Sequence, residues 1–206
     1  MSQKRFEWGK EVVQAGNDVA DLAKDVGIPG IGLLARFAQA FYDTHLQRRF
    51  ERFVSDAEID EELIEKILEN DAYSNCFYAV LEATRQTHSR IGLVALALIY
   101  RDNWKDEDYL IAAVQAFSQI SDKTVLAFIE LYESIPSDEN WLSLKVKKDG
   151  EEKFHDLYNE AVELIRRNFF VMSTYGSMHA NAPVQGMKWD HTDSYYSYCV
   201  KATELI

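Results

Sequence analysis

Residues 91–100 have the sequence Ile-Gly-Leu-Val-Ala-Leu-Ala-Leu-Ile-Tyr, the longest uncharged apolar run in the chain. A helix that crosses a bilayer needs about 20 apolar residues, so this run is too short to span a membrane. A helix that is apolar on every side is typical of the core of a globular protein. The run therefore predicts a buried helix at the centre of a soluble protein.

Helical periodicity continues on both sides of this run. Apolar residues recur at three- and four-residue steps, and the 206 residues include only three prolines. The expected helices cover residues 3–25, 32–53, 56–69, 72–88, 91–101, 106–119, 122–134 and 152–167. Ser55 and Glu58 form a capping-box pattern, which predicts the start of the third of these helices. We expect a mainly α fold with a multi-helix, bundle-like body.

The C-terminal part has a different character. Residues 169–174 and 195–200 are β-prone, and residues 175–194, which lie between them, contain two glycines and a proline. We therefore expect a small C-terminal β-hairpin with a long connecting loop. The chain then consists of a helical region over 1–101 and a second over 102–206 that ends in the hairpin, as two domains or one continuous domain.

A glycine-rich segment, residues 27–32, separates the first two expected helices. Glycine ends helices and proline cannot continue them, so we expect a hinge. The hinge residues are Gly27, Pro29, Gly30 and Gly32. A phosphate-binding loop would follow a strand and carry Gly-Lys-Ser/Thr, and this segment does neither.

Charge limits the classes of partner. The chain has 34 acidic and 22 basic residues, a formal charge of −12, whereas residues 1–53 alone are close to neutral. The acidic remainder repels phosphate backbones, so we expect no nucleic-acid partner. Cys76 and Cys199 lie far apart in the sequence, and the polar start is followed by no secretory signal. These features predict a cytoplasmic protein with reduced thiols.

Motifs for catalysis or metal binding are weak. The sequence has no Gly-x-Ser-x-Gly, His-Glu-x-x-His or Cys-x-x-Cys motif. One acidic row at helical spacing, typical of a solvated helix face, contains Glu58, Glu62, Glu65 and Glu69. A second group, whose spacing matches no closed zinc site, contains His179, Asp190, His191, Asp193 and Cys199. We expect no cofactor and no metal, and a metal-dependent enzyme with a hidden site is an alternative.

Residues 28–53 also allow a membrane interpretation. Their apolar face is followed by Arg48, Arg49 and Arg52, a pattern shared by interfacial amphipathic helices. Helices with one apolar face are the normal components of globular proteins, so we expect a core helix and no membrane partner.

The order of helix, strand, long loop and strand over residues 154–205 resembles the end of a winged-helix domain, in which the loop is the wing. This resemblance implies a nucleic-acid-linked regulator as an alternative function. Its basic face would contain Lys145, Lys147, Lys148, Lys153, Arg166, Arg167 and Lys188. The wing of a DNA-binding member is usually basic, whereas residues 175–194 carry Lys188 as their one base, which favours protein contacts.

The front half resembles a group of uncharacterised bacterial helical proteins, some of them encoded near phage-defence genes. The resemblance rests on a Pro-x-x-Gly-type break, Pro29 to Gly32, before a helix that ends in Arg48-Arg49-Phe50-Glu51-Arg52-Phe53. The resemblance implies a bacterial setting in phage defence or regulation, and no mechanism.

These observations favour a non-catalytic protein that acts through protein–protein contacts, with another protein or with a second copy of itself. The N-terminal helix has a weak apolar face that a partner would cover, formed by Phe6, Val12, Val19 and Leu22. Polar and aromatic residues near the C-terminus are further candidates, because aromatic side chains are enriched at interfaces. These are His179, Trp189, His191 and Tyr195.

Overall fold

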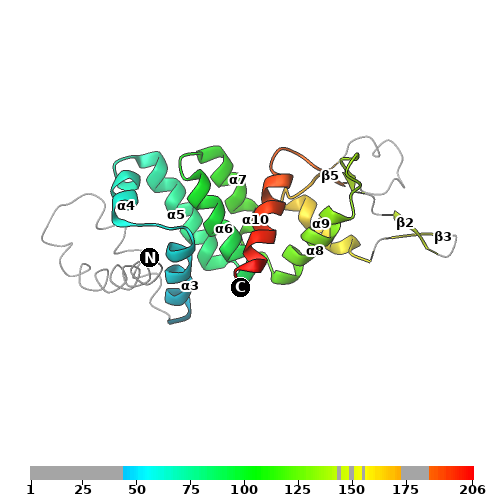
Figure 1. The fold of residues 1–206 in the computed structure, drawn as a ribbon, viewed down its shortest axis with the longest axis horizontal. Coiled ribbons are helices and arrows are strands. Elements are labelled where there is room, and N and C mark those ends of the chain that lie inside the picture. The colour runs from blue at the N-terminus through cyan, green and yellow to red at the C-terminus, as the bar shows by residue number, and fades with distance from the viewer. Residues whose placement is uncertain (1–43, 143–144, 149–150, 155, 173–185) are drawn as a thin grey trace, which may run out of the picture. The chain divides into compact units, whose positions relative to one another are not determined.

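A computed structural model describes residues 44–142, 145–148, 151–154, 156–172 and 186–206 (Figure 1). This part of the chain is mainly helical, with eight helices and a small three-stranded antiparallel sheet in the C-terminal half. The predicted fold class is therefore confirmed. The hinge Gly27–Gly32 and the N-terminal candidates Phe6, Val12, Val19 and Leu22 lie outside the described residues.

The described residues form two compact units. One contains the residues up to Thr87 together with Leu96–Val114, and the other contains His88–Ala95 and the residues from Gln115 onward. Helices α6 (Arg90–Asn103) and α7 (Glu107–Phe117) therefore contribute to both units. The apolar run that predicted a core helix lies within α6, and all ten of its residues are buried.

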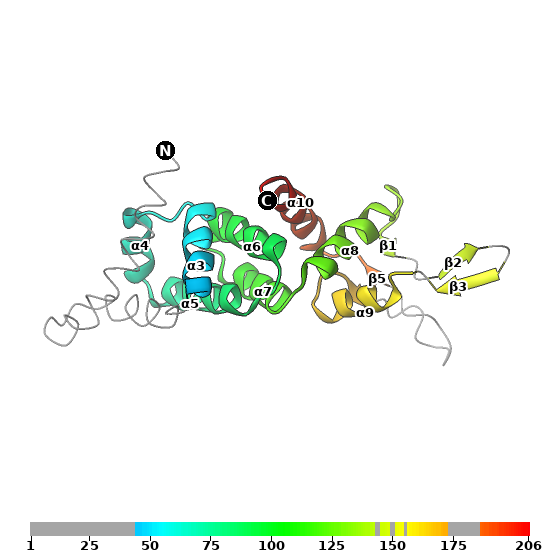
Figure 2. The same ribbon diagram turned by 90° about the horizontal axis from the view of Figure 1, so that it is seen from below.

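The first unit is built on α5 (Asp71–Gln86), which contacts both α3 (Thr44–Asp56) and α4 (Glu61–Leu68) (Figures 1 and 2). Its core contains a cluster of aromatic rings. Phe53 and Phe77 pack against Tyr100 with ring centroids 5.9 and 5.6 Å away. Burial of such rings is the main source of stability in a unit of this size.

Helix α3 ends where the capping box predicted a helix start. Glu58 has φ 54°, Glu58 N donates to Ser55 O, and Ile59 N donates to Val54 O. This is a Schellman motif, in which the apolar residue after the left-handed position packs back on the helix, and both Ile59 and Val54 are buried. The start of α4 is capped by Asp60, which accepts a hydrogen bond from Leu63 N at 2.9 Å. The capping-box prediction was therefore wrong, because burial of Ile59 favours the helix end.

The second unit combines α8 (Asp122–Glu133), α9 (Tyr158–Arg166) and α10 (Thr192–Glu204) with the three-stranded sheet. The strands are β1 (Trp141–Leu142), β4 (Val171–Met172) and β5 (Gly186–Met187), and their order is β1-β5-β4. The core of this unit is again aromatic, with neighbouring ring centroids 4.7 to 5.5 Å apart. Its rings belong to Phe117, Phe128, Phe169, Phe170 and Tyr195.

Residues 195–200 form part of α10, so the strand predicted there was wrong. Thr192, Tyr195, Cys199 and Ala202 are all buried, and their spacing places them on one face of a helix. Burial of this face outweighs the β-propensity of the tyrosines. The small sheet uses residues 171–172 instead, within the first predicted strand.

A separate hairpin occupies residues 145–154, where the sequence was interpreted as a loop over 145–150 followed by the start of the expected 152–167 helix. Strands β2 (Lys145–Lys148) and β3 (Glu151–Phe154) pair antiparallel as a separate two-stranded sheet (Figure 2). Lys148 pairs with Glu151, so the two strands are joined by Asp149 and Gly150. Asp-Gly is a strong sequence signal for a two-residue hairpin connection. Helix α9 consequently begins later, at Tyr158.

The N-terminus of α6 is fixed within the second unit by a small polar network. Ser89 Oγ accepts a hydrogen bond from Gly92 N at 2.6 Å and donates to Asp122 Oδ1 at 2.5 Å. Asp122 Oδ1 also accepts from Ile91 N at 3.0 Å. A Cβ atom on Gly92 would lie 2.8 Å from Ile120 Cγ2, so glycine is required for this close approach. The Ser–Asp pair therefore serves helix capping.

Candidate interaction surface

Two tyrosines from different helices form a stack on the second unit. The rings of Tyr132 in α8 and Tyr196 in α10 have centroids 3.9 Å apart and planes inclined by 11°. Tyr132 Oη donates to Asp193 Oδ1 at 2.8 Å, and Tyr196 Oη donates to Glu133 Oε1 at 2.9 Å. A tyrosine hydroxyl of each helix thus donates a hydrogen bond to a carboxylate of the other helix. We call Tyr132 and Tyr196 the tyrosine stack.

The helix geometry explains why these four residues meet. The buried face of α10 contains Thr192 and Tyr195, and Asp193 and Tyr196 each follow one of these residues. This places Asp193 and Tyr196 together on a neighbouring face, three residues apart. Tyr132 and Glu133 are the last two residues of α8, which contacts α10.

The environment raises the pKa of both phenols. Burial, and then the hydrogen bond to the Asp193 carboxylate, raise the pKa of Tyr132 to about 12. The hydrogen bond to Glu133, followed by burial, raises the pKa of Tyr196. Each phenol therefore stays protonated, and donates to its carboxylate, to a higher pH than a free tyrosine would.

A cation covers one end of the tyrosine stack. Lys188 Nζ lies 4.2 Å from the centroid of the Tyr132 ring. This distance is within the range for a cation–π contact. The order of groups is therefore Lys188, Tyr132 and Tyr196, with a positive charge at one end and a tyrosine ring at the other.

The segment next to Lys188 is anchored by hydrogen bonds to two consecutive backbone carbonyls. Trp189 Nε1 donates to Asn168 O at 2.8 Å, and Thr192 Oγ1 donates to Phe169 O at 2.7 Å. Thr192 Oγ1 also accepts from Trp189 N at 3.0 Å. The rings of Trp189 and His191 lie 4.4 Å apart.

We define the α8–α10 surface as seven side chains, none of which is fully buried. They are Tyr132, Glu133, Lys188, Trp189, His191, Asp193 and Tyr196. Two of the predicted contact residues, Trp189 and His191, belong to it. Tyr195 does not, because its side chain is fully buried with its ring 5.5 Å from those of Phe117 and Phe169. Its prediction as a contact residue was therefore wrong, and His179 lies outside the described residues.

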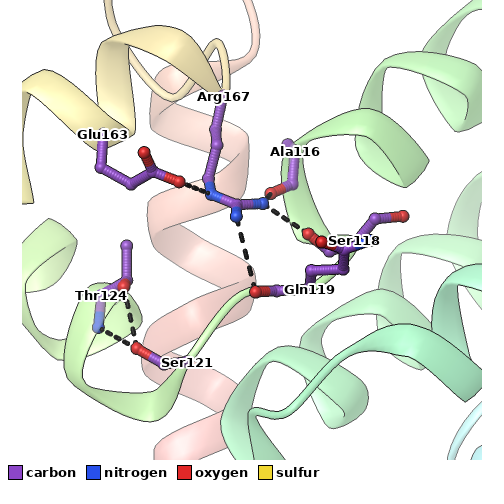
Figure 3. Close-up of polar contacts among 7 residues, drawn as sticks. All are labelled: Ala116, Ser118, Gln119, Ser121, Thr124, Glu163 and Arg167. Carbon is purple, nitrogen blue, oxygen red and sulfur yellow. Dashed lines mark hydrogen bonds and ion pairs between the residues drawn. The ribbon is translucent and has the colours of Figure 1, made fainter.

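Two members of the basic face predicted for a nucleic-acid regulator have other roles. Arg167 binds the C-terminal end of α7, where its guanidinium donates to the carbonyls of Ala116, Ser118 and Gln119 (Figure 3). Arg167 Nε also donates to Glu163 Oε1 at 2.7 Å. A cation at the C-terminus of a helix is favourable because it opposes the helix dipole. Lys188 is occupied by its contact with Tyr132.

The remaining members of that face belong to two elements. Arg166 is exposed at the end of α9. The other four belong to the β2–β3 hairpin: Lys145, Lys147, Lys148 and Lys153.

The structure describes all of the candidate metal ligands except His179. Within the described part of the chain, no group of three or more His, Cys, Asp or Glu side chains is placed to hold a metal ion. Glu58 lies between α3 and α4, so the acidic row does not lie on a single helix. Cys199 is fully buried in α10, and burial raises the pKa of its thiol.

The described residues also bear on the membrane alternative. No helix in them is both long and apolar enough to cross a bilayer. Phe50 and Phe53, at the end of the segment considered for interfacial binding, are buried in the first unit.

Comparison with known proteins gives no match: no family model, curated protein or solved structure is significantly similar to this chain.

Proposed function

We propose that the protein acts without catalysis, through protein–protein contacts, and that a partner docks on the α8–α10 surface. The observation that carries this proposal is the tyrosine stack with its crossed hydrogen bonds to Asp193 and Glu133. Tyrosine and tryptophan supply large contact areas and are enriched at the centres of interfaces.

The side chains of this surface are held in place before any partner binds. Both tyrosine hydroxyls are hydrogen-bonded, and Trp189 is tied to Asn168 O. A preorganised surface loses less conformational entropy on association than a mobile one. The network therefore favours binding as well as the packing of α10 on α8.

Charge favours a different protein over a second copy. The chain has a formal charge of −12, and the surface includes the exposed carboxylates of Glu133 and Asp193. A symmetric contact between two copies would place like charges in one interface. A partner with a complementary charge avoids this repulsion.

The test is purification of the full chain from its native host at low and moderate salt, with mass measurement of the complex. The variant Tyr196→Lys changes the surface, and Leu126→Lys is its control because Leu126 is 51% exposed on the same helix as Tyr132. We expect a stoichiometric protein partner with the wild type and with Leu126→Lys at both salts, and its loss with Tyr196→Lys. Retention of the partner by Tyr196→Lys, or the absence of any partner, would contradict the proposal.

A winged-helix-like regulator is the second candidate. Helix α9 leads into β4, and β4 pairs with β5 across residues 173–185, which gives the winged-helix order of helix, strand, connection and strand. The roles of Arg167 and Lys188 argue against a basic recognition face. Nucleic acid that copurifies at low salt and is lost at moderate salt would favour this candidate.

A further inference from the structure

The two rings of the tyrosine stack differ in what covers them. Tyr132 has Lys188 on one side and Tyr196 on the other. Tyr196 has Tyr132 on one side, and within the described ranges no other ring or cation is in contact with it. The stack therefore ends at the half-buried ring of Tyr196.

The groups around this end favour a positive charge. Glu133 is exposed, and its carboxylate oxygen Oε1 accepts a hydrogen bond from the Tyr196 hydroxyl. A carboxylate has further lone pairs, so it can accept a second donor. The contact of Lys188 with Tyr132 shows that the same stack binds a cation at its other end. A cation at the partly exposed Tyr196 would thus lie beside both an aromatic ring and a carboxylate.

We propose that the partner's docking segment is basic and that one of its arginine side chains stacks on Tyr196 and bonds to Glu133. A planar guanidinium can lie on an aromatic ring while its N–H groups point to a carboxylate beside the ring, which a lysine ammonium does less well. The formal charge of −12 favours approach of a basic segment. This inference rests on the proposed function of the α8–α10 surface.

The test measures binding of the full chain to a fluorescent hexa-arginine peptide by anisotropy at moderate salt. Tyr196→Leu removes the ring, Tyr196→Phe keeps the ring without the hydroxyl, and Glu133→Gln removes the charge. Glu130→Gln is the matched control, because Glu130 is exposed on the same helix and the substitution changes the charge equally. Circular dichroism checks that each variant is folded.

We expect Tyr196→Leu and Glu133→Gln to weaken binding by about fivefold each, the size of a partly desolvated cation–π or ion-pair contact. Tyr196→Phe should lose less than Tyr196→Leu, and Glu130→Gln should bind as the wild type does. Replacement of arginine by neutral citrulline should abolish binding, and hexalysine should bind more weakly than hexa-arginine.

Equal losses in Glu133→Gln and Glu130→Gln would show diffuse attraction to an acidic surface and would overturn the inference. So would hexalysine that binds as tightly as hexa-arginine. If Tyr196→Lys loses the native partner but substitutions at Tyr196 and Glu133 leave the affinity for the peptide unchanged, the inference fails and the docking surface is retained. If both substitutions weaken peptide binding but the native partner still binds Tyr196→Lys, the docking role fails and the cation site is retained.

Discussion

At the scale of single residues, Thr192 has the clearest structural role in the second unit. Its hydroxyl is fully buried and connects Trp189 N to Phe169 O. Thr192→Val keeps the shape of the side chain but removes the buried hydroxyl that joins these two backbone groups. We expect a loss of about 1–3 kcal/mol in the free energy of unfolding, measured by urea denaturation.

The matched control is Thr203→Val in the same helix. Thr203 Oγ1 also bonds to a backbone carbonyl, that of Val200, but the residue is exposed. Water replaces a lost hydrogen bond at an exposed position, so this change should stay within about 0.5 kcal/mol of the wild type. Equal effects of the two substitutions would refute the role of buried Thr192.

At the scale of secondary-structure elements, Arg167 connects the end of α9 to the end of α7. Arg167→Met keeps an apolar stem but leaves the carbonyls of Ala116, Ser118 and Gln119 without the guanidinium that binds them (Figure 3). We expect a loss of about 2 kcal/mol in stability, because hydrogen bonds to charged groups are strong. Faster amide hydrogen exchange should appear in α7.

Arg166→Met provides the comparison for this prediction. Arg166 is the neighbouring residue, carries the same charge and is exposed. Its replacement should therefore leave both the stability and the exchange rates of α7 nearly unchanged. The capping role of Arg167 would be rejected if Arg166→Met and Arg167→Met behaved alike.

The helices that sequence predicted best are those with local signals. Helix α8 was expected over 122–134 and spans Asp122–Glu133, where Ser121 Oγ accepts from Thr124 N as its N-cap. Helix α6 was found because its apolar run is continuous. A cap or an apolar run depends on neighbouring residues alone, so both can be identified without tertiary information.

Helix α10 was missed because its local composition and its burial disagree. The tyrosines of residues 195–200 favour a strand, and the helical spacing of Thr192, Tyr195, Cys199 and Ala202 was the signal that would have identified a helix. Packing against the aromatic core favours the helix over the strand. The β2–β3 hairpin had a local signal as well, the Asp149-Gly150 pair.

At the scale of the whole molecule, the α8–α10 surface could be predicted only in part. Trp189 and His191 were named from the sequence as contact candidates because aromatic residues are enriched at interfaces, and their contact role stays a prediction. The tyrosine stack was not predicted, since its hydrogen bonds join residues 61 and 63 positions apart. Contacts of that separation follow from the way α8 meets α10, which no local pattern contains.

The pH dependence of stability tests the phenols of both units together. Burial raises the pKa of Tyr100 in the first unit, and burial with the Asp193 hydrogen bond raises that of Tyr132 in the second to about 12. Tyrosines of the unfolded chain lose their protons near pH 10. Above that pH the unfolded state therefore binds fewer protons than the folded state, and ionisation favours unfolding.

This contribution to stability should be complete below pH 10 and should be lost as the pH rises from 10 towards about 12. Urea denaturation at intervals between pH 8 and 11.5 measures the loss, and absorbance at 295 nm follows phenolate formation. Tyr132→Phe removes one of the protons that the folded state retains, so stability should fall less steeply with pH in this variant. An identical slope in the wild type and Tyr132→Phe would show that the Tyr132 phenol, which donates to Asp193, takes no part in the alkaline loss of stability.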